Sequence, residues 1–310
     1  MPLLKLVKED THIRFTSHRG IAFMLSALII IGSLFQLTVS GLNFGIDFTG
    51  GTLVEIKTDG PADIADLRQR FSGLDLGSVS IQEFGAVDEI LIRVPQQADA
   101  EMQKQTELMA IIRGAIDDVV LEYRRVEFVG PQVGAELIVS GAKAVFFSLL
   151  GILIYIWIRF EWPFGVAAVG ALIHDTILTL GFFAVTQIEF NLSTVAAVLM
   201  IAGYSINDTV VVFDRVRENL RKYKRKALDE LFDMSINQML ARTLVTSVTT
   251  LLALIALWFF GGEVIRGFIL TLIVGVLIGT YSSVYIATPL LLYIKPDALR
   301  PDVNAVPQTP

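Results

Sequence analysis

Six long apolar stretches dominate the pattern of hydrophobic and polar positions along the chain. Their approximate residue ranges are 20–40, 139–158, 164–184, 193–213, 241–260 and 265–294. A bilayer core requires roughly 20 mainly apolar residues per helix, and each stretch reaches or approaches that length. The pattern therefore predicts an α-helical polytopic membrane protein with six transmembrane helices. The first stretch predicts a retained anchor, because its apolar run is too long for the core of a signal peptide.

Lysine and arginine are unevenly distributed among the connections, which predicts the orientation of the helices. The connections at 185–192 and 261–266 contain only one basic residue, Arg266. The basic residues concentrate before the first stretch and in the fourth connection: Lys5, Lys8, Arg14, Arg19, Arg215, Arg217, Arg221, Lys222, Lys224, Arg225 and Lys226. We therefore expect a cytoplasmic segment at 1–19, an external segment at 41–138, and a cytoplasmic, disordered tail at 295–310.

The external segment has the alternation of a small folded domain. Period-two patterns predict strands near residues 51–57, 79–83, 90–94 and 123–128. Helical spacing predicts one helix that has Pro61 in its first turn and a longer helix from about 102 to 119. This order is the split βαβ pattern of ferredoxin-like α+β domains. The segment contains no histidine and no catalytic constellation, so we expect binding or docking from it.

The stretch FGIDFTGG, residues 44–51, allows two interpretations. Its glycines and its acidic residue are compatible with a ligand-binding loop, but it lacks the Gly-Lys-Ser/Thr ending of a phosphate loop. The favoured interpretation is a stiff joint between the first membrane helix and a strand, since glycine permits positive φ. Its expected joint residues are Gly45, Asp47, Gly50 and Gly51, with Gly130, Pro131 and Gly134 as the matching joint before the second span.

Composition removes several classes of function. The chain is 53% hydrophobic, 18% charged and has a mean hydropathy of +0.61, which agrees with a membrane protein. A net charge of −6 gives no support for nucleic-acid binding. With no cysteine there are no disulfides, thiolate metal sites or cysteine nucleophiles. We expect no metal, no cofactor and no enzymatic activity.

Charged residues inside the apolar stretches are the candidates for function. An aspartate at a helix centre costs about 2.5–3.5 kcal/mol on insertion scales. Asp208 lies inside the fourth stretch, and Arg242 lies at the start of the fifth. A contact between them would lower the cost of both charges. Either the pair is a static ion pair, or Asp208 binds and releases a proton while Arg242 adjusts its acidity.

Other polar groups near the membrane also allow two interpretations each. His174 and Asp175, near the middle of the third stretch, either extend a water-filled path or form a hydrogen-bonded pair between helices. Asp214 and Arg215 are expected at a solvated helix end. The basic run at 221–226 is expected to set topology and contact anionic lipids, with docking to a cytosolic partner as the weaker alternative.

Several motifs in order resemble the SecD/SecF family of bacterial protein-export membrane proteins. FGIDFTGG resembles its shared Gly-Gly motif, and VGPQVGAEL at 129–137 resembles its entry into the second span. The later motifs are similar to the SecF branch specifically: HDTILTLGFF at 174–183, IAGYSINDTVVVFDRVREN at 201–219, SINQMLARTLVTSVTTL at 235–251 and GTYSSVYIATPL at 279–290. The likeness runs from about residue 10 to 295.

The resemblance implies a half-transporter of the resistance-nodulation-division type in the bacterial inner membrane. It implies SecD, the SecYEG channel, YajC, YidC, a translocating unfolded polypeptide and membrane lipids as partners. Asp208 and Arg242 match positions that the family uses in proton movement, and His174 and Asp175 complete the expected proton pathway. The coupling ion is expected to be H⁺, with Na⁺ as the alternative. A proton-driven exporter of small molecules or lipids and a non-coupling scaffold are the competing functions.

Overall fold

The computed structural model describes residues 11–74, 76–77, 79–95 and 102–294. These residues form two compact units. A helical unit takes in the described residues up to 43, residues 145–188, and those from 193 onward. A sheet unit takes in residues 44–144 and 189–192. The expectations for Lys5, Lys8 and the tail at 295–310 lie outside the described residues.

Long apolar helices form the helical unit. Four lie entirely within it: α1 (Arg19–Val39), α6 (Trp162–Thr186), α8 (Leu228–Phe260) and α9 (Arg266–Ser282). Two others, α5 (Pro131–Arg159) and α7 (Leu192–Lys222), belong to it from residue 145 and from residue 193 onward, respectively. Shorter pieces are η1 (Thr16–His18), η2 (Glu263–Ile265), the π-helical η3 (Ser283–Ala287) and α10 (Thr288–Leu290). Within the described residues, six helices are long and apolar enough to cross a membrane, which confirms the predicted number.

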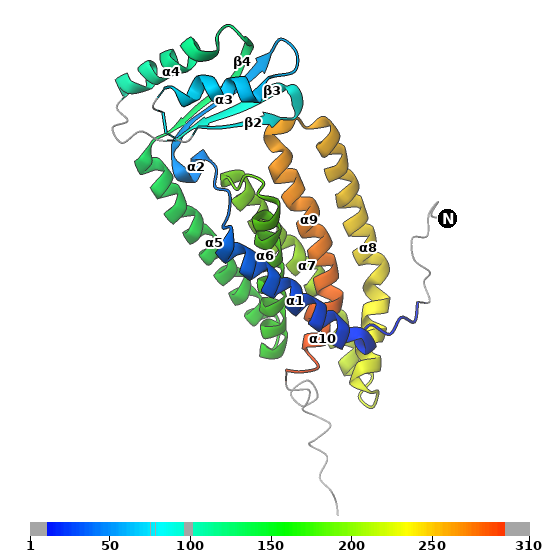
Figure 1. Cartoon of the computed structure of the whole chain (residues 1–310). Helices are drawn as coiled ribbons and strands as arrows, with labels where there is room; N and C mark the ends of the chain where they lie inside the picture. Colours follow the sequence, from blue (N-terminus) through cyan, green and yellow to red (C-terminus); the bar gives the residue numbers. More distant parts are fainter. Residues whose placement is uncertain (1–10, 75, 78, 96–101, 295–310) are drawn as a thin grey trace, which may run out of the picture. The chain divides into compact units, whose positions relative to one another are not determined.

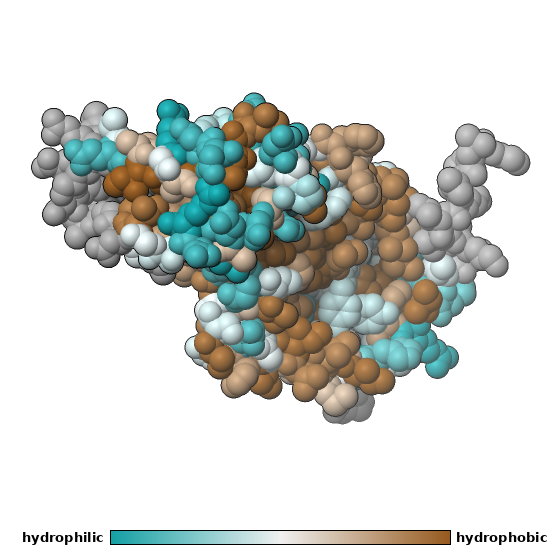
Figure 2. Space-filling view, turned by 45° about the horizontal axis from the view of Figure 1, so that its top comes forward, coloured by the Kyte–Doolittle hydropathy of each residue, from teal (hydrophilic) through white to brown (hydrophobic). Residues whose placement is uncertain are grey.

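The membrane helices extend further than their apolar windows. The second spanning helix begins at Val133 instead of 139. α7 has 31 residues and α8 has 33, so at ~1.5 Å per residue they are longer than a ~30 Å hydrocarbon core. The apolar window ends where the first charged residues occur, whereas the helical backbone hydrogen bonds continue past those residues. The surface in Figure 2 is extensively hydrophobic over the helices, while hydrophilic residues gather on the sheet unit.

Small residues set the close packing of the membrane helices. A Cβ atom on Gly275 of α9 would collide with the side chain of Ile201 on α7. One turn further, a Cβ atom on Gly279 would lie 3.0 Å from the Cβ atom of Ser205. Between α6 and α1, a Cβ atom on Gly181 would collide with Ser33. Small residues therefore allow the helices of the bundle to pack closely.

The sheet unit has the predicted split βαβ order. Its strands are β1 (Gly51–Thr58), β2 (Ser80–Phe84), β3 (Ala86–Val94) and β4 (Val120–Val129), and its helices are the short α2 (Ile46–Thr49), α3 (Ile64–Ser72) and α4 (Met102–Ile116). The strands form one antiparallel sheet in the order β2-β3-β1-β4. In Figure 1, α3 and α4 lie on the same face of the sheet. Between them and the sheet lies a core that contains Val54, Ile56, Ile90, Ile92, Leu67, Phe71, Ile112 and Ile116. The ferredoxin-like prediction is confirmed.

The start of the first domain helix was wrongly predicted from sequence. α3 begins at Ile64, so Pro61 lies before the helix and not in its first turn. The carboxylate of Asp63 accepts hydrogen bonds from the backbone amides of Ala65 at 2.9 Å and Asp66 at 3.1 Å. This cap satisfies amides that have no partner inside the helix. The acidic cap, rather than the proline, therefore decides where the helix begins.

Candidate functional site

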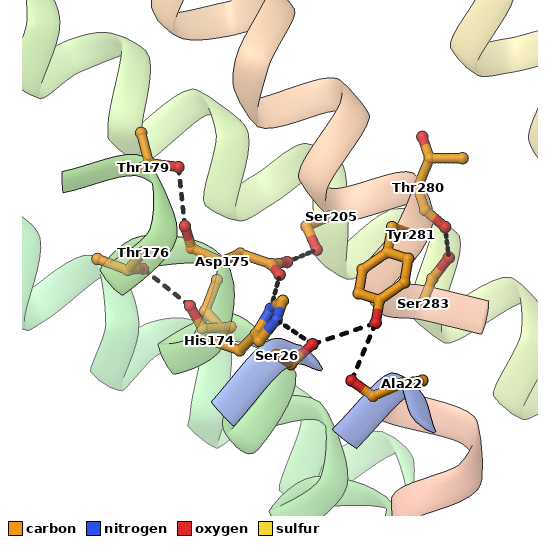
Figure 3. A network of polar contacts seen from close by, with 11 residues as sticks. Ala22, Ser26, His174, Asp175, Thr176, Thr179, Ser205, Thr280, Tyr281 and Ser283 are labelled. Atoms are coloured by element: carbon orange, nitrogen blue, oxygen red, sulfur yellow. Dashed lines mark hydrogen bonds and ion pairs between the residues drawn. The ribbon is translucent and has the colours of Figure 1, made fainter. Parts of the chain in front are cut away.

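A buried polar network surrounds His174 and Asp175 in the middle of the helical unit (Figure 3). The two residues are only 3% and 1% exposed. Nδ1 of His174 lies 2.8 Å from Oδ1 of Asp175, and Oδ2 of Asp175 accepts a hydrogen bond from Ser205 Oγ at 2.5 Å. Nε2 of His174 lies 3.1 Å from Ser26 Oγ, which lies 3.1 Å from the hydroxyl of Tyr281. That hydroxyl donates to a carbonyl of α1 at 3.2 Å.

This network joins four helices, because its members come from α1, α6, α7 and α9. A neutral imidazole satisfies both contacts when Nδ1 carries the proton and Nε2 accepts from Ser26. An imidazolium is accommodated as well, if the hydroxyl of Ser26 rotates to donate to Tyr281. A fully satisfied polar network in a low-dielectric interior stabilises one arrangement of its helices. The geometry therefore supports the pair as a link between helices, and its role in a water-filled path remains a prediction.

A second polar group lies on α7 beside residues that have no hydrogen-bond partner. Asp208 is 4% exposed, and its Oδ2 atom is buried without a partner in the described part of the chain. The hydroxyls of Thr209 on α7, Thr243 on α8 and Ser282 on α9 share that condition. An unpartnered buried polar group costs about 1–3 kcal/mol, so four such groups require a compensating role or water.

Helix geometry brings these unpartnered groups to one level of the bundle. Ser247 on α8 contacts both Tyr204 of α7, at 3.4 Å, and Thr280 of α9, at 2.7 Å. α8 runs antiparallel to the other two helices, and side chains four residues apart lie on the same face of a helix. One turn further along the three helices therefore come Asp208, Thr243 and the start of the π-helical segment at Ser283. Single-turn π segments are frequent at functional sites because they interrupt regular helix packing.

The predicted contact between Asp208 and Arg242 is not formed. Among the ion pairs of the described residues, none joins these two side chains. Arg242 is exposed on α8, whereas its neighbour Thr243 is buried. Successive residues on a helix point about 100° apart, so only one of the two faces the interior. Arg242 remains within electrostatic reach of the Asp208 carboxylate without bonding to it.

The glycine-rich stretch turns the chain into β1 within the sheet unit. Gly50 and Gly51 have φ angles of +70° and +124°, which glycine adopts at no steric cost. Gly134, near the start of α5, packs on the same stretch, because a Cβ atom there would lie 3.2 Å from the carbonyl oxygen of Phe48. A Cβ atom on Gly130 would lie 3.8 Å from the ring of Phe128, an ordinary contact, and Pro131 is the first residue of α5. The two predicted joints therefore touch each other.

The joint also holds the loop between α6 and α7, which sequence reasoning did not anticipate. The backbone amide of Gly45 donates to the carbonyl of Phe190 at 2.9 Å. The carboxylate of Asp47 accepts a hydrogen bond from the backbone amide of Leu192, which is distant in the sequence, at 2.8 Å. Arg93 of β3 forms an ion pair with Glu189. Three phenylalanine rings, those of Phe44, Phe48 and Phe190, lie within 5.7–6.1 Å of each other.

Burial leaves Glu189 electrostatically sensitive. Desolvation raises the pKa of its carboxyl above the ordinary value, and the nearby Arg93 guanidinium opposes that shift. A Cβ atom on Gly45 would collide with this carboxylate, so the joint has room for the ion pair only when residue 45 is glycine. The sequence signal for the loop is its two polar residues, Glu189 and Asn191, immediately before an apolar run.

The hydroxyl groups of the buried network were also missed. The apolar stretches contain these hydroxyls among many hydrophobic residues, so the hydrophobic pattern does not distinguish them: Ser26, Ser205 and Tyr281. The available signal was positional. Ser26 lies near the middle of an apolar run, and Ser205 lies three residues before Asp208. Hydroxyls in such positions often form hydrogen bonds across membrane helices.

Two family models match the chain. The model described as "Protein export membrane protein SecD/SecF, C-terminal" covers residues 111–297, and the model described as "SecD/SecF GG Motif" covers residues 37–62. The second match contains the joint at 44–51, and the first contains His174, Asp175, Asp208 and Arg242.

Curated relatives and solved structures agree with these matches. Protein translocase subunit SecF of Rickettsia rickettsii (strain Sheila Smith) is 44% identical over 291 residues, which is 93% of this chain and 94% of that protein. The corresponding Rickettsia felis protein is 43% identical over 288 residues, with the same coverage. The crystal structure of SecDF, a translocon-associated membrane protein from Thermus thermophilus, has a TM-score of 0.84 at 34% identity.

That alignment covers 93% of this chain but 39% of the SecDF chain. A second SecDF crystal structure, in the super-membrane-facing form, has a TM-score of 0.65 at 32% identity, over 99% of this chain and 41% of that one. This chain therefore spans about two fifths of each solved SecDF chain and almost the whole length of the curated relatives. The apolar helices, the sheet unit, the family matches and the similarity across 93% of the sequence together show that the chain is a multi-pass membrane protein of the SecD/SecF family, in its SecF branch.

Proposed function

We propose that this chain is an accessory subunit of the bacterial Sec export machinery that couples ion flow through the membrane to movement of its external domain. The relatives named protein translocase subunit SecF support the export role. Asp208 carries the coupling role, as a buried carboxylate inside a spanning helix with one oxygen unpartnered. Ionisable groups inside a membrane are costly and usually serve ion or substrate pathways.

The proposed cycle moves a proton through Asp208. Protonation removes the charge of the carboxylate and with it the attraction that Arg242 exerts on α7. The unpartnered hydroxyls of Thr209, Thr243 and Ser282 supply hydrogen bonds to the water molecules that such a path requires. The available energy is about 2.3 kcal/mol per elementary charge for each 100 mV of membrane potential.

The joint supplies a route from α7 to the external domain. The sheet unit holds the first residue of α7 through the bond between Asp47 and the backbone amide of Leu192. Leu192 and Asp208 belong to the same continuous helix, about 24 Å apart at ~1.5 Å per residue. A shift of α7 along its axis therefore pulls on the joint, and the joint pulls on β1.

The proposal includes a location and a set of partners. The chain lies in the bacterial inner membrane with both termini cytoplasmic and the sheet unit periplasmic, as the distribution of basic residues favours. It assembles with SecD and with the SecYEG channel, and more peripherally with YajC and YidC. The external domain contacts the emerging unfolded polypeptide and hinders its return.

The test replaces Asp208 with asparagine, which keeps size and removes the charge. In cells that depend on the variant, we expect export of a secreted reporter to fall and to lose its dependence on the proton-motive force. Asp214→Asn is the matched control, since Asp214 is half-exposed and paired with Arg159. Unchanged export with Asp208→Asn, at an equal membrane level of the protein, refutes the coupling role and leaves a scaffold.

Two further measurements separate the remaining alternatives. Replacing the proton gradient by a sodium gradient in membrane vesicles identifies the ion, and we expect export to follow H⁺. Accumulation of a labelled small molecule in knockout cells with intact secretion would identify a small-molecule exporter instead. Recovery of SecD and SecYEG on affinity purification from native membranes supports the export role.

A further inference from the structure

A basic hollow lies where α5 ends and α7 leaves its apolar section. It has a volume of about 450 Å³ and is lined by Arg159, Asp214, Arg217, Glu218, Arg221 and Lys222. Four of these side chains are cationic and two are carboxylates, so the hollow carries a positive balance. All six belong to the helical unit. None of them takes part in the His174 network or in the group around Asp208.

The two carboxylates are already neutralised by arginine. Asp214 accepts two contacts from the guanidinium of Arg159, at 2.8 and 3.0 Å. Glu218 accepts from Arg215, which lies outside the hollow, at 2.6 Å. The charges of Arg217, Arg221 and Lys222 therefore have no carboxylate partner among the described residues. An anion that enters the hollow meets these three cations.

Arg217 lines the hollow and has hydrogen-bonding capacity that the described chain does not use. Its Nη1 atom donates to the carbonyl of Arg159 at 3.3 Å, which fixes the guanidinium in the hollow. Its Nε atom is buried and has no hydrogen-bond partner in the described chain. A buried donor without a partner is costly, and a guanidinium matches the oxygen atoms of a phosphate in a two-pronged geometry.

The position of the hollow relative to the membrane indicates which class of phosphate compound it would bind. The spanning part of α5 ends at Arg159, one of the lining residues. Trp157 and Trp162 flank it and are 69% and 46% exposed, and tryptophan favours the interface between hydrocarbon and water. None of the apolar window of α5 is buried inside the chain, so its surface is available to acyl chains.

We propose that this hollow binds the phosphate of an anionic phospholipid whose acyl chains lie along α5. Arg217 and Arg221 hold the phosphate oxygens, and Lys222 adds its charge. The proposal differs from a general attraction of the basic run to the membrane surface, because it names a site. It does not depend on the proposed coupling role of Asp208.

The test measures lipid binding by the purified full-length protein with native mass spectrometry. Phosphatidylglycerol is compared with phosphatidylcholine, and inorganic phosphate is added in a separate arm. We compare two double variants, each of which removes two exposed cations from residues 221–226: Arg221→Gln with Lys222→Gln inside the hollow, and Lys224→Gln with Arg225→Gln outside it. Thermal unfolding in phosphatidylcholine micelles checks that each variant remains folded.

We expect one phosphatidylglycerol to be retained in preference to phosphatidylcholine. The variant inside the hollow should weaken that binding about tenfold more than the control variant, because surface attraction alone treats the two pairs alike. Arg217→Gln should weaken it as well, because it removes one of the three cations that have no carboxylate partner among the described residues. Equal weakening by both double variants, or binding of inorganic phosphate as strong as that of the lipid, would overturn the proposal.

Discussion

Removal of a single hydroxyl, by Ser205→Ala, tests whether the network around His174 and Asp175 holds the helices together. Ser205 on α7 donates to the carboxylate of Asp175 on α6 at 2.5 Å, and both groups are buried. The substitution keeps the Cβ atom that packs against Gly279, so the helix spacing is unchanged. It leaves one oxygen of a buried carboxylate without its partner.

Two general magnitudes bracket the expected cost. Hydrogen bonds to charged groups contribute about 1.5–3 kcal/mol in water-soluble proteins. Hydrogen bonds between membrane helices average only about 0.6 kcal/mol and reach about 1.7 kcal/mol, because polar groups find other partners in the unfolded chain within the membrane. The second range applies here, and the carboxylate places this bond at its upper end. We expect Ser205→Ala to lower the free energy of unfolding by about 1.5 kcal/mol.

Ser282→Ala is the matched control. Ser282 is also a fully buried serine on a spanning helix, but its hydroxyl has no partner in the described chain. Its replacement should leave stability within about 0.5 kcal/mol of the original, or raise it. The measurement is reversible unfolding in mixed micelles, followed by circular dichroism. If the two variants lose the same free energy, the bond to Asp175 has no special weight and the linking role is wrong.

Three further predictions concern the joint and the helix packing. Burial raises the pKa of Glu189 in the folded state above its ordinary value of 4.5, so protonation of Glu189 stabilises the fold fully below about pH 4.5, and this stabilisation is lost as the pH rises through the raised pKa. Glu189→Gln should remove this component from the pH dependence of the free energy of unfolding. An unchanged pH dependence would contradict the prediction. Gly45→Ala should displace the α6–α7 loop and lower the free energy of unfolding by about 1–3 kcal/mol, whereas Gly130→Ala, whose Cβ would lie 3.8 Å from its neighbour, should be tolerated. Hydrogen exchange of the loop amides distinguishes the two variants, and equal protection of these amides in both would argue against a collision between the added Cβ atom at residue 45 and Glu189. Gly275→Ala should destabilise the α7–α9 contact by about 1–3 kcal/mol. Gly203→Ala, whose Cβ would have nothing within 4 Å, should stabilise the protein by up to about 1 kcal/mol through helix propensity. Thermal unfolding that ranks the two variants in the opposite order would refute this account.

The architecture was largely predictable from local patterns. Six apolar stretches and the alternation of 51–57, 79–83 and 90–94 are properties of neighbouring residues, and they predicted the spanning helices and the order of the sheet unit. Motifs such as SIND and LART predicted the family. The exact ends of helices were less predictable, since the cap at Asp63 competes with the proline before it.

The candidate site was predictable only in part. A charge such as Asp208 inside an apolar run is visible in the sequence, and the structure confirms its burial. The expected contact with Arg242 was wrong, because residue spacing does not give the rotation of α8 about its axis. His174 contacts Ser26 on α1, which lies 148 residues before it, and Ser26 in turn contacts Tyr281 on α9, more than 100 residues after it.

The amino-acid sequence by itself determined which segments are apolar enough to span a membrane, which segment forms the sheet unit and that Asp208 lies inside a spanning helix, because hydrophobicity and periodicity act over a few residues. Only the tertiary structure decided which polar groups meet. The carboxylate of Asp47 bonds the amide of Leu192, and that of Asp175 bonds Ser205, across 145 and 30 residues of chain. Such contacts depend on how helices rotate and pack, and therefore on many side chains at once.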